Sequence, residues 1–424
     1  MKKIVVRGPI LTRSGYGEQA RFALRALRQY EDKFDIYILN TNWGQTGWIH
    51  EDNEERRWID KLITKTATAE HENKLPQFDL SLQVTIPNEW QRIANKNIGY
   101  TAGIETTSIS LEWVEKSNSM DQIIVVSNHS KYGFDTSSYD VSNSKTGEKI
   151  DGYKCTTPVH VVNYAIRSFQ PEDMGIDFET DFNFLCVSQW GIRKNLENTI
   201  LWFLDEFKND EVGLVLKINR INNSLMDHEH VHDSLSNLLD RYSDRKCKVY
   251  LLHGDLNDGE MTYLYRHPKI KALINLSHGE GFGLPMFEAA YNELPVVAPN
   301  WSGQNDFLYA PAKHKKRKKT FKKAHFATVD YALQPVQKEA VWDKVLIEES
   351  MWCFPHMGNY KMKIRDVYKN HGQYKSMAKK LKTHLQKNFT EEQQYEKFVN
   401  VLELGEVPEE DVDQMFNKLI VNNG

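Results

Sequence analysis

Short apolar runs alternate with amphipathic helical segments along most of this chain, and this alternation constrains the fold more than any other feature. Apolar runs of strand length occur in the first half at residues 4–6, 34–39, 80–84, 97–100, 122–126 and 159–162. A second series follows at 182–187, 214–218, 248–252, 270–276 and 295–298. Because strands that alternate with helices form parallel sheets covered on both faces, we expect an α/β protein.

The length predicts two such domains, since 424 residues exceed the usual size of one hydrophobic core. The segment 168–181 contains Pro171 and several acidic residues, which is typical of a linker. We therefore place an N-terminal domain at 1–167, a linker at 168–181 and a C-terminal domain at 182–395. Residues 373–385 and 391–404 carry apolar residues on one helical face, and the polar stretch 140–155 is predicted to be irregular.

Composition excludes some classes of function and location. The formal charge of -4 argues against a globally basic nucleic-acid binder. No run approaches the roughly 20 apolar residues that a membrane helix needs. The four cysteines are far apart and lack paired metal-binding spacing, which indicates reduced thiols. We expect a cytoplasmic protein, in the host cytoplasm if the source is viral.

The most informative turn joins the strand predicted at 270–276 to a helix predicted at 286–292. Its glycines break the strand, and Pro285 suits the first helical turn. Backbone N–H groups at such a helix start attract anionic or hydroxyl-rich ligands. Glu280 and Glu288 flank the turn, so they could hold two different parts of one long ligand.

Other strand-to-helix turns carry further candidates. Gly15 and Gly17 lie in a run that loosely fits the dinucleotide-binding fingerprint, although an ordinary flexible connection fits equally well. Arg193 and Lys194 suit a phosphate, the alternative being a solvated basic pair. Gly254 could contact a nucleobase through its backbone. Glu105 follows a strand at the sheet edge where ligands bind, as an acceptor-side group or as a helix-capping or solvated glutamate.

Two more motifs have competing interpretations. Residues 228–232 match the H-E-x-x-H zinc signature, but the polar setting and lack of an evident third ligand favour the exposed start of a surface helix. The basic run from Lys313 to Lys323 is typical of a solvated loop. It could instead bind a phosphate backbone, which makes DNA a candidate partner.

Together, the two α/β halves and the run from Glu280 to Ala290 resemble the retaining nucleotide-sugar glycosyltransferases of family 4, in particular phage-type members. The resemblance implies the GT-B fold, with two Rossmann-like domains facing a cleft and a C-terminal helical segment, 396–424, that crosses back to the first domain. It also implies a hexosyltransferase that needs no metal or other cofactor and uses a nucleotide-diphosphate sugar as donor.

The resemblance assigns roles to the candidate residues. Glu280 would contact the donor sugar near its reacting carbon, and Glu288 would hold the ribose. Arg193 and Lys194 would neutralise the departing diphosphate, and Gly15 and Gly17 match the family's N-terminal glycine loop. The backbone of the turn would line the sugar and approach the phosphates, through Gly281, Phe282, Gly283 and Leu284.

Two departures from the family pattern concern catalysis. Many members have a histidine where this chain has Gly103, Ile104 and Glu105, and many have an arginine where it has Ser188 and Gln189. Arg193 could substitute for that arginine. The acceptor is left open, a modified base in DNA being one possibility. The alternatives are a nucleotide-dependent oxidoreductase or epimerase built on Gly15 and Gly17, and a non-catalytic module that binds sugar or nucleic acid.

Overall fold

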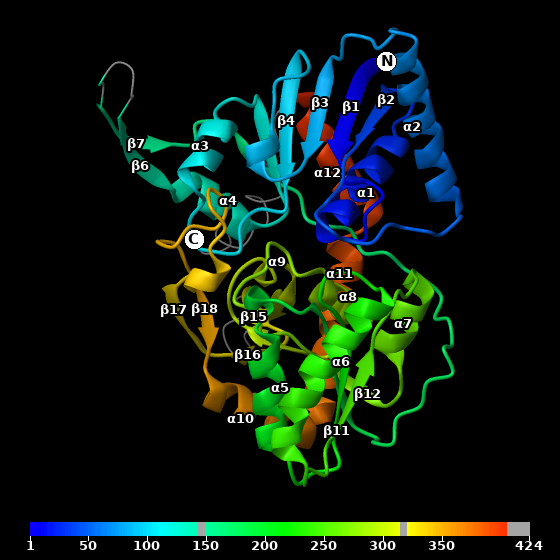
Figure 1. The fold of residues 1–424 in the computed structure, drawn as a ribbon, viewed down its shortest axis with the longest axis vertical. Helices are drawn as coiled ribbons and strands as arrows, with labels where there is room; N and C mark the ends of the chain where they lie inside the picture. The colour runs from blue at the N-terminus through cyan, green and yellow to red at the C-terminus, as the bar shows by residue number, and fades with distance from the viewer. Residues whose placement is uncertain (143–146, 148, 314–319, 405–424) are drawn as a thin grey trace. The chain divides into compact units, whose positions relative to one another are not determined.

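The computed structural model describes residues 1–142, 147, 149–313 and 320–404, and the chain divides into two compact units. The first comprises Met1–Ala165 and Val336–Ser350 together with the chain from Glu391 onward. The second comprises Ile166–Pro335 and Met351–Thr390 (Figure 1). Between them, residues 162–178 contain no helix or strand, in the region where the sequence predicted a linker.

A six-stranded parallel sheet forms the centre of the first unit, in the order β2-β1-β3-β4-β5-β8. Its strands are β1 (Lys2–Gly8), β2 (Phe34–Asn40), β3 (Leu80–Val84), β4 (Lys96–Thr101), β5 (Gln122–Val125) and β8 (Val159–Val161). All residues of β3 and β5 are buried, as expected of inner strands with both faces covered.

The helices of the first unit are α1 (Gly15–Arg28), α2 (Glu54–His71), α3 (Leu111–Ser117), α4 (Asn128–Thr136) and α12 (Glu391–Leu404), with the short 3₁₀ segments η1 (Pro87–Glu89) and η4 (Lys338–Ala340). Although α12 is at the end of the described chain, it packs on α1 (Figure 1). The ring of Phe22 lies 5.3 Å from that of Tyr395 and 5.7 Å from that of Phe398. A C-terminal helix that returns to the first domain is therefore confirmed over Glu391–Leu404. Residues 405–424 of the predicted segment 396–424 lie outside the described part of the chain.

One sequence expectation in this unit was wrong. Residues 140–142 and 149–154 of the stretch 140–155 are not irregular, because β6 (Ser138–Ser142) and β7 (Lys149–Lys154) pair antiparallel. Most of their residues are exposed, so the strands show no buried, apolar face in the sequence.

The second unit contains a parallel sheet in the order β11-β10-β9-β12-β13-β16. Its strands are β9 (Asn183–Gln189), β10 (Gly213–Asn219), β11 (Lys248–Leu252), β12 (Ile270–Ile274), β13 (Val296–Pro299) and β16 (Ala327–Val329). Chain order reverses between β9 and β12, which are hydrogen-bonded neighbours. Ligands bind beyond the carboxyl ends of the strands at such a reversal.

Helices and two hairpins complete this unit. The helices are α5 (Leu196–Phe207), α6 (Leu225–Leu239), α7 (Asp258–Arg266), α8 (Leu284–Tyr291), α9 (Asn305–Leu308), α10 (Met357–Lys369) and α11 (His371–Asn388), and the 3₁₀ segments are η2 (Ile192–Lys194) and η3 (Asp240–Tyr242). The antiparallel hairpins pair β14 (Tyr309–Lys313) with β15 (Thr320–Ala324) and β17 (Tyr331–Pro335) with β18 (Met351–Pro355).

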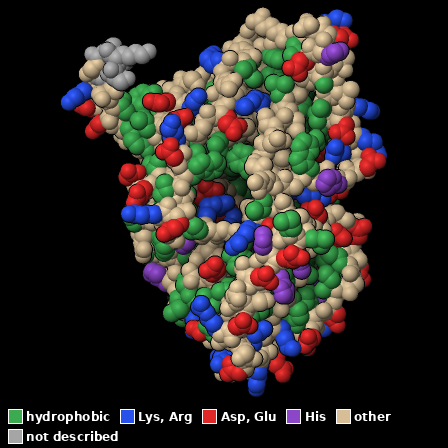
Figure 2. All heavy atoms as spheres, viewed as in Figure 1, with side chains coloured by type: hydrophobic (Ala, Val, Ile, Leu, Met, Phe, Trp, Pro, Cys, Tyr) green, Lys and Arg blue, Asp and Glu red, His purple; other side chains and the backbone are tan. Residues whose placement is uncertain are grey.

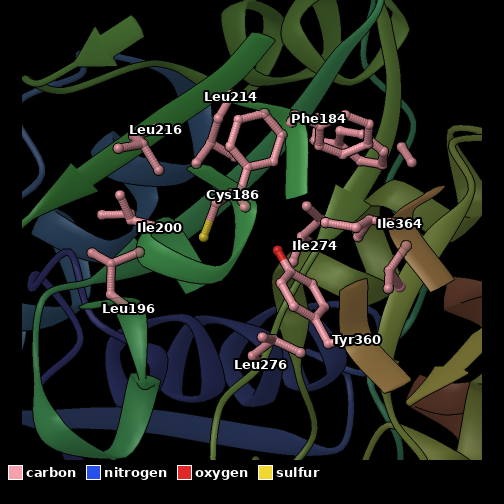
Figure 3. Close-up of a cluster of buried hydrophobic side chains, with 14 of the residues drawn as sticks. Phe184, Cys186, Leu196, Ile200, Leu214, Leu216, Ile274, Leu276, Tyr360 and Ile364 are labelled. Atoms are coloured by element: carbon pink, nitrogen blue, oxygen red, sulfur yellow. The ribbon is translucent and has the colours of Figure 1, made fainter. Parts of the chain in front are cut away.

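The core of the second unit fixes its sheet against α5 and α10. Figure 3 shows side chains from three neighbouring strands meeting those of the two helices, among them Phe184, Leu214, Ile274, Ile200 and Ile364. Each of these five is fully buried, which is worth roughly 1.5–3 kcal/mol per side chain. This packing holds the carboxyl ends of β9 and β12 in place.

On the face drawn in Figure 2, acidic and basic side chains are interspersed.

Candidate functional site

The glycine turn after β12 closes on a buried carboxylate. Gly283 caps α8 with φ 97°, a left-handed conformation that favours glycine, and Pro285 occupies the first helical turn. Glu280 lies in the turn, and only 6% of its surface is exposed. The predicted sequence of strand, glycine turn and helix is therefore present, with the carboxylate inside the unit rather than on its surface.

Two cations from the neighbouring strand-to-helix turn hold this carboxylate. Lys194 Nζ donates to Glu280 Oε1 at 2.6 Å, and Arg193 Nη1 donates to Oε2 at 3.2 Å. Both cations belong to η2, directly after β9. Glu280 and the two cations, which the sequence placed on two separate turns, are thus in direct contact at the point where the strand order reverses.

The environment keeps Glu280 ionised. Burial alone would raise its pKa, but Lys194 and Arg193, with hydrogen bonds from Lys194 and Ser277, lower the pKa from 4.5 to about 2. At neutral pH the group is a carboxylate that accepts hydrogen bonds and has no proton to give. It cannot act as a general acid.

The two turns are also joined through the backbone. The His278 amide donates to the Arg193 carbonyl at 2.8 Å, and the Asn195 side-chain amide donates to the Leu276 carbonyl at 3.2 Å. Asn195 adopts φ 51°, a left-handed conformation that asparagine tolerates better than most residues. These bonds fix where the two cations lie relative to Glu280.

A third loop, after β13, supports the glycine turn from behind. Ser302 Oγ accepts a hydrogen bond from the Glu280 amide at 2.9 Å, and the Gly303 amide donates to the Glu280 carbonyl at 2.9 Å. A Cβ on Gly303 would lie 2.0 Å from the carbonyl oxygen of Gly281, so only glycine fits this approach.

Sequence reasoning missed these supporting residues. Ser302 and Gly303 were not singled out in the sequence. Ser277, whose hydroxyl lies 2.8 Å from Glu280 Oε1, was not singled out either. A polar residue directly after a buried strand was the available signal for Ser277. No pattern marks the left-handed Ser302, which has φ 73°.

Glu288 lies on α8, one turn before the helix ends. Its Oε2 accepts a hydrogen bond from the hydroxyl of buried Tyr265 at 2.7 Å. Phe282 is buried against Phe287 and Phe307, and Leu284 is the first residue of α8. Glu288 and Glu280 thus have different hydrogen-bond partners within the unit.

Gly254 follows β11 with φ 109°, and its carbonyl accepts a hydrogen bond from Lys217 Nζ at 2.8 Å. Behind this turn, Asp227 Oδ2 lies 2.9 Å from His253 Nε2, and both side chains are buried. Asp227 also accepts the backbone amides of Arg220 and Ile221, so it ties the turn after β10 to the turn after β11.

The zinc interpretation of residues 228–232 finds no support. These residues lie in the first turns of α6, as the surface-helix interpretation expects. In the part of the chain that the structure describes, no group of three or more His, Cys, Asp or Glu residues could hold a metal ion.

The remaining predicted residues belong to the first unit. Gly15 begins α1 in open space, whereas a Cβ on Gly17 would lie 2.1 Å from the Thr12 carbonyl oxygen. Close packing therefore accounts for Gly17 without a ligand. Glu105 is half-buried in the loop after β4. Burial raises the pKa of the Tyr16 hydroxyl, a hydrogen bond with Thr101 opposes this rise, and the negative charge of Glu105 adds to it.

The two ends of the basic run lie in the paired strands β14 and β15, and Lys322 and Lys323 of β15 are exposed. Residues 314–319 lie outside the described part of the chain. Within the described residues, no helix combines the length and apolar character needed to cross a membrane.

Comparison with known proteins shows the fold. No family model matches the sequence, and no curated protein sequence matches it significantly. Among solved structures, the chain is similar to sucrose-phosphate synthase from Thermosynechococcus elongatus, with a TM-score of 0.60 and 12% identity over 100% of both chains. It is also similar to a glycosyltransferase from Rickettsia africae, with a TM-score of 0.55 and 14% identity over 95% and 99% of the two chains.

A third similar structure is the lipopolysaccharide outer core galactosyltransferase WaaB, with a TM-score of 0.54 and 11% identity over 95% and 99% of the chains. With the two parallel sheets and the returning α12, these similarities identify the GT-B fold. At such low identities they define the architecture alone.

Proposed function

We propose that this protein is a retaining glycosyltransferase that moves a hexosyl group from a nucleotide-diphosphate sugar to an acceptor. One observation carries the proposal: two cations at a strand-to-helix turn meet a buried, ionised glutamate where the strand order reverses. In a Rossmann-like sheet this is the edge where nucleotides bind. Similarity to glycosyltransferase structures supports the same class at the level of fold.

The cations suit the leaving group of this reaction. As the sugar–phosphate bond breaks, negative charge develops on the nucleoside diphosphate, and fixed cations that face this charge stabilise the transition state. Lys194 and Arg193 are positioned by backbone bonds from both turns, so little reorganisation is needed. They take the part that a metal ion plays elsewhere, and we expect transfer to persist in a chelator.

Glu280 then binds the donor sugar rather than the leaving group. A hydrolase needs one protonated carboxyl group to act as general acid, whereas the pKa of Glu280 is about 2. An ionised carboxylate accepts hydrogen bonds from sugar hydroxyls. We assign Glu280 to the hydroxyls near the reacting carbon and Glu288 to the ribose. The backbone from Gly281 to Leu284 lines the sugar and the phosphates, and Gly254 lies against the base.

In this proposal Glu105, in the loop after β4, is the candidate acceptor-side group, and the turn at Gly15 is a candidate cradle for the donor diphosphate. The basic run from Lys313 to Lys323 makes DNA a candidate acceptor, because each lysine that neutralises a phosphate strengthens binding at low salt. Retention of configuration by front-face attack rests on the resemblance described above.

Ligand thermal shift tests the class of the protein. A ligand that binds only the folded state at 100 times its Kd stabilises the fold by about 2.7 kcal/mol. UDP or GDP should raise the melting temperature of the wild type and not that of Lys194→Ala. A control, Lys208→Ala, removes a surface lysine of the same unit, paired with Asp244, and should behave as wild type.

The alternatives predict different outcomes in this assay. Stabilisation by nicotinamide cofactors and not by UDP or GDP would instead indicate an oxidoreductase or epimerase. A protein that binds sugar nucleotides and never forms product would be a binding module.

A further inference from the structure

A cavity of the second unit lies at the amino-terminal ends of β12 and β13, whereas Glu280 lies beyond the carboxyl end of β12. It has a volume of about 360 Å³, and its lining includes Ile270, the first residue of β12, and Pro295, just before β13. Glu280 follows the other end of β12. A five-residue strand separates the two places, roughly 16 Å at about 3.3 Å per residue. The cavity is therefore distinct from the proposed donor site.

Cations dominate the lining of this cavity. Arg266, Lys271, Lys375 and Lys382 contribute four positive charges, and Glu293 is the one carboxylate among the lining residues. Two histidines also line it, but burial lowers the pKa of each, so both are neutral at neutral pH. The lining has a net charge of about +3, by contrast with the formal charge of -4 of the whole chain.

The geometry of α11 directs several of these groups to one side. His371, Lys375 and Lys382 are separated by four and seven residues and all line the cavity, as such spacing places residues on one helical face. Lys375 Nζ donates to the Glu293 carbonyl at 2.9 Å, and Lys382 Nζ lies 3.4 Å from Glu293 Oε2. An ammonium group carries three N–H donors, so each lysine retains capacity for a ligand after this bond.

Hydrogen bonds connect this cavity to α8 and to Glu288. Arg266 Nε donates to Asn292 Oδ1 at 2.7 Å, and the Asn292 side-chain amide donates to the Glu288 carbonyl at 3.0 Å. Tyr265, also in the lining, donates to Glu288 Oε2. The cavity lining therefore reaches the Glu288 carboxylate through Tyr265 and the Glu288 backbone carbonyl through Asn292.

We propose that this cavity binds a small phosphate-bearing anion, and that its occupation changes the affinity of the donor site through Tyr265, Asn292 and Glu288. A compact polyanion matches the clustered cations, since lysine and arginine bind phosphate oxygens by charge-assisted hydrogen bonds. The cavity is within the size range of small-molecule sites. The coupling rests on the proposed function of Glu288, whereas the binding of an anion does not.

Calorimetric titration with inorganic pyrophosphate tests the site in the full chain. The double variant Lys375→Ala/Lys382→Ala should lose this binding by at least tenfold, and Lys194→Ala should keep it. The control Lys380→Ala/Lys387→Ala removes the same charge from α11 at positions outside the lining and should bind as wild type. Absence of pyrophosphate binding in the wild type, or loss only in Lys194→Ala, would overturn the site.

A second titration tests the coupling. Pyrophosphate should change the affinity of the wild type for UDP or GDP. By linkage, the nucleotide should change the affinity for pyrophosphate by the same factor. If pyrophosphate instead competes with the nucleotide directly at Arg193 and Lys194, the effect would persist in Lys375→Ala/Lys382→Ala. Coupling through the cavity would vanish in that double variant and in Tyr265→Phe. If competition alone is seen, the coupling is wrong and the anion site stands. If neither nucleotide binds, the proposed function fails while the first titration still decides the anion site.

Discussion

Replacing Glu280 by glutamine tests the arrangement of charges on which the site depends. The substitution preserves shape and removes the charge that Lys194 and Arg193 contact at 2.6 and 3.2 Å. Since the pKa of Glu280 falls from 4.5 to about 2 in the folded chain, its ionised form contributes roughly 3 kcal/mol to stability at 1.36 kcal/mol per pKa unit. We expect Glu280→Gln to lower the free energy of unfolding by about that amount at pH 7.

The stability difference between wild type and Glu280→Gln should depend on pH, in the direction set by the pKa shift. A folded-state pKa below the unfolded value means that the stabilisation is complete above pH 4.5 and is lost as the pH falls towards 2. The advantage of wild type over Glu280→Gln should therefore fall by about half between pH 5 and pH 3. Urea unfolding followed by tryptophan fluorescence measures this difference.

The control for this experiment is Glu229→Gln, which changes an exposed glutamate of α6 in the same unit and should stay within about 0.5 kcal/mol of wild type. Equal stability of Glu280→Gln and wild type at pH 7 would refute the reasoning. So would an advantage that is unchanged at pH 3.

Three further predictions concern the loop behind the site, the returning helix and the basic run from Lys313 to Lys323. Gly303→Ala should weaken nucleotide binding at least tenfold in calorimetry, because its Cβ would meet the Gly281 carbonyl oxygen, whereas Gly358→Ala on α10, with no atom within 4 Å of its Cβ, should bind normally. Phe398→Ala should destabilise the first unit by about 3–5 kcal/mol. Hydrogen exchange should then rise in β1–β4 and not in β9–β12, and an equal rise in both sheets would contradict the packing of α12 on the first unit. Replacing Lys315, Lys316, Lys318 and Lys319 by glutamine should weaken DNA binding and flatten its salt dependence, and an unchanged salt slope would remove DNA as the proposed acceptor.

Much of the sheet architecture was predictable from sequence because inner parallel strands are apolar on both faces. The bounds of β3 and β11 agree with the predicted residues 80–84 and 248–252. Hairpin strands were harder to find, since β7 is almost entirely exposed and contains no apolar run. The sequence also contained no signal that Val336–Ser350 returns to the first unit. This return depends on polar contacts between residues distant in sequence, such as Ser350 Oγ with the Ser108 amide at 3.1 Å.

The site was predictable as a set of turns and not as a set of contacts. Arg193, Lys194 and Glu280 each follow a strand, and their strands are sheet neighbours, so their proximity follows once the strand order is known. Their direct pairing does not follow, because it depends on bonds such as that from the His278 amide to the Arg193 carbonyl. The support from Ser302 depends on a backbone conformation that serine rarely adopts, and no sequence pattern signals it.

The central claim is that Lys194 and Glu280 form part of a nucleotide-sugar site. Its most direct test incubates wild type, Lys194→Ala and Lys208→Ala with a panel of sugar nucleotides and measures nucleoside diphosphate release and sugar-modified products by mass spectrometry. We predict release from at least one donor by wild type and Lys208→Ala, and a loss of at least 100-fold in Lys194→Ala. Release that is undiminished in Lys194→Ala would contradict the account.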